Sequence, residues 1–203
     1  MKAGNKRVIV LSVILVAVAA LGYMWQTNRG PFQGDGIAGP PSGHIRVDHH
    51  RASHIDLLLV NYGGVSYNLF GRQVHVYIAH YERDELILHE LVGGVATVDA
   101  HEFTGTALWG VTTEEGQRRE LRVRVDMNGA AGSSYFDFSR LGFDEGPLGM
   151  SGPIITDGEI EPGRRYVLQV WQTGSRFWAD GDVFNPERLR ESERTAILYI
   201  VFE

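Results

Sequence analysis

The chain has 203 residues, a formal net charge of −6 at pH 7 and no cysteine. The absence of thiols excludes disulfides, cysteine metal sites and a lipid-modified N-terminal cysteine. The first 29 residues contain four basic residues and no acid, so the remaining residues carry a charge of −10. This acidic balance argues against nucleic acid or anionic lipid headgroups as ligands.

The N-terminal region contains an uncharged apolar run from Val8 to Trp25, preceded by a basic stub at residues 1–7. An 18-residue helix is about 27 Å long at ~1.5 Å per residue, close to the ~30 Å hydrocarbon core of a bilayer. Basic residues on the short side favour a cytoplasmic N-terminus. The sequence therefore predicts a single-pass signal-anchor at residues 8–25, with the rest of the chain outside the cytoplasm.

The competing interpretation of the same segment is a secretory signal peptide. Ala17-Val18-Ala19 has the small-x-small pattern of a cleavage site, and cleavage near Ala19 would yield a secreted protein. Against cleavage, the apolar run continues to Trp25, and Tyr23 and Trp25 suit an interfacial aromatic belt. An uncleaved anchor is preferred, and both interpretations place the domain outside the cytoplasm. A cysteine-free extracytoplasmic protein fits a bacterial origin.

A Gly/Pro-rich segment follows the apolar run and predicts a flexible linker at residues 26–53. The remaining residues, 54–203, are enough for one domain with a real hydrophobic core. The sequence thus predicts four parts: a cytoplasmic stub, a membrane segment, a linker and one extracytoplasmic domain.

Beyond the linker, apolar residues recur with a period of two, which is typical of strands with one solvated face. Residues 196–202 are apolar at every position, as expected of a central strand. We expect strands at 55–62, 65–70, 74–79, 85–92, 103–111, 120–125, 133–138, 166–171 and 196–202. Turn signals separate them at Gly63-Gly64, Arg83-Asp84, Gly93-Gly94, Glu115-Gly116, Asn128-Gly129 and Pro162-Gly163.

The one helical signal in this region is Asn185-Pro186-Glu187, an N-cap residue followed by proline, which predicts a short helix towards Ser192. Many short strands and little helix predict an all-β domain. The fold class is therefore an antiparallel β-sandwich with jelly-roll or immunoglobulin-like topology, preceded by one N-terminal transmembrane helix.

A first candidate site is the histidine cluster of His44, His49, His50 and His54, to which Asp48 adds a carboxylate. Imidazoles and carboxylates are zinc ligands, so the cluster is a candidate metal site. The plainer interpretation is a polar linker end that enters the first strand. That interpretation is preferred because a structural zinc site needs four ordered ligands. We therefore expect the protein to bind no cofactor.

A second candidate site comprises Arg176, Trp178, Asp180 and Asp182, which combine an indole ring with carboxylates and a guanidinium. Proteins bind sugars through such sets, with the apolar ring face on the aromatic and the hydroxyls on charged groups. Packing of Trp178 in the core is the competing interpretation, since tryptophan is highly buried on average.

No motif identifies a family, and no catalytic residue is predicted, because nucleophile elbows, phosphate-binding glycine loops and zincin helices are missing from the sequence. We therefore expect a membrane-anchored extracytoplasmic β-sandwich with a non-catalytic binding or structural role and a protein or cell-surface polysaccharide as partner. The alternatives are a polysaccharide-binding module and, from another class, a hydrolase whose site forms no sequence motif.

Overall fold

A computed structural model describes residues 3–26, 39–48, 59–112, 119–128, 130–143, 148–151, 155, 157–174 and 182–203. The predicted N-terminal helix is present as α1 (Ala3–Gln26), and its described side chains from Ser12 to Tyr23 are exposed. No helix in these described ranges meets the length and apolarity required of a membrane span.

The rest of the described chain is mostly antiparallel sheet, which confirms the all-β prediction. A 3₁₀ helix, η3 (Phe138–Leu141), and a single-turn helix, α3 (Pro186–Leu189), interrupt the strands. The strands are β1 (His44–Val47), β2 (Leu59–Glu82), β3 (Glu85–Thr112), β4 (Glu120–Met127), β5 (Ala130–Asp137), β6 (Leu148–Ser151), β7 (Gly158–Glu159), β8 (Tyr166–Thr173) and β9 (Arg194–Phe202).

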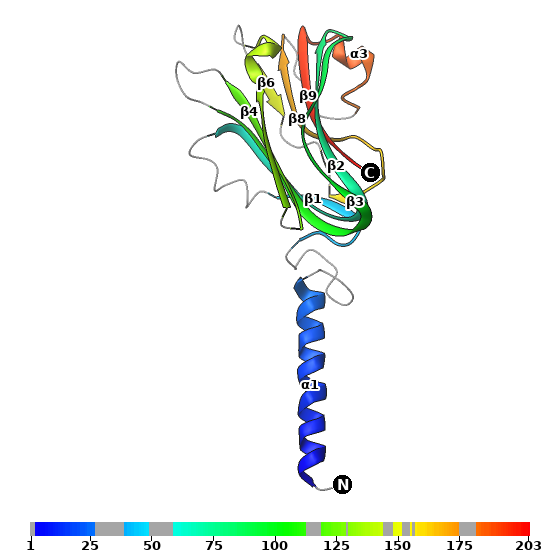
Figure 1. Ribbon diagram of the computed structural model, residues 1–203. Helices are drawn as coiled ribbons and strands as arrows, with labels where there is room; N and C mark the ends of the chain where they lie inside the picture. Colours follow the sequence, from blue (N-terminus) through cyan, green and yellow to red (C-terminus); the bar gives the residue numbers. More distant parts are fainter. Residues whose placement is uncertain are drawn as a thin grey trace.

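Two long strands, β2 and β3, form a hairpin that belongs to both layers of the sandwich (Figure 1). The first half of β2 pairs with β1 and the second half of β3 pairs with β4, which together form one layer with β5 and β7. The second half of β2 pairs with β9, and β8 and β6 complete the other layer. The described strands are thus one continuous sheet bent upon itself, which we call the bent sheet.

The strand order differs from the predicted jelly-roll or immunoglobulin-like topology. Consecutive strands β2, β3, β4 and β5 lie side by side as a meander. Strand β9 pairs with the second half of β2. Both expected topologies are built on Greek keys, in which the fourth strand of a set returns to lie beside the first, and the meander of β2 to β5 makes no such return. The period-two pattern identifies strands but carries no information on which strands pair.

The glycine pairs explain why several predicted strands are parts of one longer strand in the structure. Gly63-Gly64 and Gly93-Gly94 lie inside β2 and β3, so the turns predicted there are wrong. A Cβ on Gly63 would lie 2.2 Å from Trp109 Cζ2, and one on Gly94 would lie 2.7 Å from the Val74 carbonyl oxygen. These glycines permit close approach within the bent sheet, a role that glycine often has in strands.

The other described turn signals are confirmed. Arg83 and Asn128 have positive φ angles between paired strands, and Gly163 has a φ of 76° before β8. The Asn185 side chain caps α3 by accepting the Glu187 N–H at 2.9 Å. Residues 44–47, inside the range predicted as linker, form β1, whose Ile45 is buried in the core.

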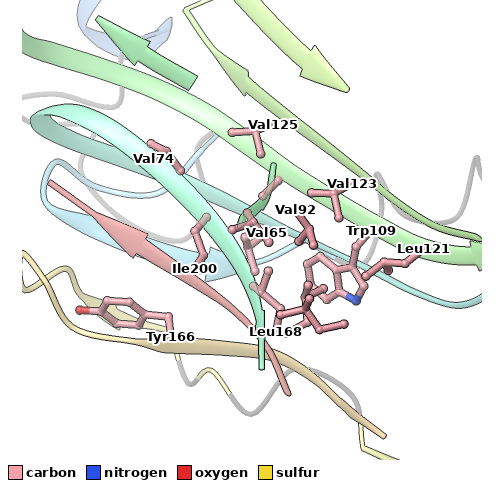
Figure 2. Close-up of a cluster of buried hydrophobic side chains, with 14 of the residues drawn as sticks. Val65, Val74, Val92, Trp109, Leu121, Val123, Val125, Tyr166, Leu168 and Ile200 are labelled. Carbon is pink, nitrogen blue, oxygen red and sulfur yellow. The ribbon is translucent and has the colours of Figure 1, made fainter. Parts of the chain in front are cut away.

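The main core lies between the two layers and contains valines, leucines and aromatic rings from both (Figure 2). Trp109 of β3 donates its indole N–H to Gln169 Oε1 of β8 at 3.4 Å, so a buried hydrogen bond joins the layers. A second cluster covers the outer face of the β2–β9–β8 layer, where Val183 and Leu189 pack on Ile197 and Tyr199. The 182–192 segment is therefore anchored to that outer face.

Candidate functional site

A pocket of about 550 Å³ lies where the turn before β8 meets the start of the 182–192 segment. Its size falls within the usual range of small-ligand pockets. The described residues that line it are Ile155, Gly158, Glu159, Glu161, Arg164, Arg165, Tyr166, Val167, Asp182, Val183 and Phe184.

Local hydrogen bonds fix the shape of the turn that forms one wall of the pocket. The Tyr166 hydroxyl accepts the Glu161 N–H at 2.7 Å and donates to the Glu159 carbonyl oxygen at 3.0 Å. Gly163 adopts the left-handed conformation that the turn requires. On the opposite wall, Asp182 Oδ1 accepts the Phe184 N–H at 3.1 Å. Both walls are therefore held by short-range contacts that the local sequence specifies.

The pocket is rich in charge, and its charged side chains are exposed. Arg164 forms an ion pair with Glu161, with 2.5 Å between Nη1 and Oε1, and its guanidinium lies over the Tyr166 ring. Glu159 and Asp182 bring two further carboxylates. A ligand with several hydrogen-bonding groups would find donors and acceptors on both walls.

Arg165 has the most distinctive environment in the pocket. Its guanidinium lies 4.8 Å from the centre of the Phe184 ring and 5.5 Å from that of the Tyr199 ring. Among the residues that the structure describes, no hydrogen bond or ion pair occupies its N–H groups. The two cation–π contacts hold the guanidinium in place while its donors stay available, a combination that arginine offers and lysine does not.

An aromatic cluster on the outer face of the sheet continues from Arg165. Tyr199 stacks on Tyr77, with 5.5 Å between the ring centres, and its hydroxyl lies 2.6 Å from His89 Nε2, within hydrogen-bond distance. Burial raises the pKa of the Tyr199 hydroxyl, and the Arg165 guanidinium partly offsets this rise. Tyr199 therefore stays neutral at physiological pH, and its ring contacts the Arg165 guanidinium.

Of the residues predicted to bind a ligand, Asp182 is a lining residue of this pocket. Arg176, Trp178 and Asp180 lie outside the described residues, so their positions relative to the pocket are not tested.

Of the predicted metal ligands, His44 lies at the start of β1, and its Nδ1 is 2.9 Å from the Ser42 carbonyl oxygen. His49, His50 and His54 lie outside the described residues. Within the part of the chain that is described, no group of three or more His, Asp or Glu side chains could hold a metal ion.

Sequence reasoning did not identify Arg165, Phe184 and Tyr199 as site residues. One signal was present, because Tyr199 alternates with the apolar core positions of its strand and so faces the other side of the sheet. What brings Phe184 over that face is the packing of the 182–192 segment, which no periodicity reveals.

No family model matches the chain, and no curated protein and no solved structure matches it.

Proposed function

We propose that the chain is a membrane-anchored, non-catalytic binding protein whose β-sandwich presents the pocket to a saccharide outside the cytoplasm. The observation that carries this proposal is the lining of the pocket, where exposed carboxylates and the Arg165 guanidinium surround aromatic rings. Sugar hydroxyls pair with carboxylates and guanidinium donors, and the apolar face of a sugar ring packs on an aromatic ring.

The lining favours binding over catalysis. Its described residues include no serine, cysteine or histidine, so they cannot form a serine or cysteine nucleophile paired with a histidine base. Two of the three carboxylates have structural partners: Glu161 pairs with Arg164, and Asp182 accepts the Phe184 N–H. Paired carboxylates can nevertheless hydrolyse glycosides, so a hydrolase is the alternative from a different class.

Sedimentation with insoluble bacterial wall polysaccharide tests the binding proposal on the full-length protein in detergent. Arg165→Ala and Asp182→Asn should each lower the bound fraction strongly, because each removes a group that faces the ligand. Arg122→Ala is the matched control, since Arg122 is an exposed arginine of β4 paired with Glu120. It should bind as the wild type does.

Two results would contradict the binding proposal. Wild type that ignores every wall polysaccharide, or pocket variants that bind as well as Arg122→Ala, would remove the pocket as the site. Release of new reducing ends from the polysaccharide would instead favour the hydrolase.

The anchor is the second part of the proposal, and α1 is the segment that supplies it. The uncharged run from Val8 to Trp25 is apolar on all sides of a helix. Its described apolar side chains, among them Val13, Leu15 and Val18, are exposed. An exposed helix that is apolar all round is typical of a membrane segment.

Fractionation of cells that express the full chain tests the anchor. The protein should stay with the membranes after an alkaline carbonate wash, and protease added to right-side-out vesicles should digest the domain. Its intact mass should include the N-terminal residues. A domain protected from protease would contradict the orientation, and a chain that starts near Ala20 would show cleavage.

A further inference from the structure

An unusual bulge lies where the hairpin of β2 and β3 bends. In the register, Gly71 pairs with His101 and Gln73 pairs with Ala96, so residues 97–100 of β3 face only one residue of β2. Thr97 Oγ1 lies within hydrogen-bond distance of the Arg72 and Asp99 carbonyl oxygens, at 3.1 and 3.0 Å. The bulge is therefore a braced protrusion.

The bulge presents an apolar side chain to solvent. Val98 is 93% exposed, and Phe70, nearby on β2, is 70% exposed. These two are the most exposed large apolar side chains of the described part of the domain. Bulges are typically features with a purpose, and clustered exposed apolar residues mark contact surfaces.

The same end of the domain receives the chain from α1. Pro40 accepts a hydrogen bond from the Asn68 amide at 3.4 Å through its carbonyl oxygen, and Ser42 Oγ donates to Glu102 at 3.2 Å. Glu102 pairs with Phe70 across the hairpin. Residues 40–42 therefore enter the domain beside Phe70, close to the bulge.

The opposite end of the hairpin lies much farther from this entry point. From Ala96 to Leu86, β3 runs ten residues along the strand, which is about 34 Å at ~3.4 Å per residue. Twelve residues connect Gln26 with Gly39 and can span at most about 45 Å. Of the two ends of the domain, the bend is thus the end at which the connection from α1 enters.

We propose that Val98 and Phe70 insert into the headgroup region of the bilayer that holds α1. This inference rests on the anchor proposed above. The domain carries a charge of −10 beyond residue 29, so attraction to anionic lipid does not drive the contact. Burial of apolar side chains at the interface does, and the contact should therefore form on zwitterionic lipid and resist salt.

The test uses the full chain reconstituted into phosphatidylcholine vesicles. Because the protein has no cysteine, Val98→Cys and Leu86→Cys each provide one labelling position for an environment-sensitive fluorophore. Leu86 is the matched control, an exposed apolar residue of the same strand at the far end. Equal melting curves for both labelled variants and the wild type show that the fold is kept.

We expect the fluorophore at residue 98 to shift its emission to the blue on reconstitution and to lose fluorescence to a headgroup-level lipid quencher. The fluorophore at residue 86 should do neither, and the difference should persist in high salt.

Retention of the protein by the vesicles after an alkaline carbonate wash reads out the anchor separately. If the protein is retained but residue 98 is quenched no more than residue 86, the insertion of Val98 is refuted and the anchor stands. If the protein is not retained, the anchor fails and the insertion fails with it. Protection of residue 98 only when a second protein is added would also refute the lipid contact.

Discussion

Arg165 is the residue on which the proposed chemistry depends most. A guanidinium held against the Phe184 and Tyr199 rings is positioned before any ligand arrives, so little side-chain freedom is lost on binding. Lysine at the same position would keep the charge but could neither stack as a plane nor offer two parallel donors. The pocket is therefore built around a specific side chain and not around charge alone.

His80 carries the clearest pH dependence of stability. Burial lowers the pKa of its imidazole; the Glu82 carboxylate opposes the shift and the Arg194 guanidinium adds to it. The unfolded chain takes up this proton below about pH 6.5, whereas the folded chain resists it. Neutral His80 therefore makes its full contribution to the free energy of unfolding above about pH 6.5. This contribution is lost as the pH falls below that value.

We expect the melting temperature of the wild type to fall as the pH drops from about 6.5 to about 5.5, above the range where carboxylates titrate. His80→Leu should flatten this part of the profile, since Nε2 of His80 has no partner among the described residues. His101→Leu, at a half-buried position beside the bulge, serves as the control and should keep the wild-type slope. Parallel slopes for all three proteins would refute the role of His80.

At the scale of elements, α3 holds one wall of the pocket although it is only one turn long. Its N-cap, Asn185, directly follows Phe184, and Leu189 at its end is buried in the outer cluster. A loss of the cap should therefore loosen both the helix and the Phe184 ring.

Asn185→Ala should lower the free energy of unfolding by about 1 kcal/mol, the usual cost of losing an N-cap. That corresponds to a fall of about 2–4 °C in melting temperature for a domain of this size. Asn185→Asp should be nearly neutral because its carboxylate can accept the same N–H. Denaturant titration of the three proteins checks this, and equal losses for both variants would show that the cap contributes nothing.

Whether a glycine predicts a turn correctly depends on the role of that glycine in the structure. Asn128 and Pro162-Gly163 signalled real turns, because a positive φ is a local property that adjacent residues encode. Gly63-Gly64 gave the same signal, yet it lies inside β2 because Trp109, 46 residues away, leaves no room for a side chain. A single sequence cannot distinguish a glycine needed for φ from one needed for space.

At the scale of the whole molecule, the site too depends on which distant segments pack together, and a single sequence does not reveal this. Asp182 was predicted as a ligand-binding residue from its local sequence, and it is a lining residue of the pocket. Arg165 lies 17 positions earlier, just before β8, and reaches the pocket only because the 182–192 segment packs on the outer face of the bent sheet. The site is thus a product of the tertiary structure, whereas the strands follow largely from periodicity.

The central claim is that this pocket, and not another face of the domain, receives a saccharide. Amide chemical shifts of the full-length protein in nanodiscs, recorded while a soluble fragment of wall polysaccharide is added, test it most directly. We predict that the shifts concentrate at Arg165, Val167 and Phe184 and disappear in Arg165→Ala. Shifts centred elsewhere, or none at millimolar fragment, would contradict the account.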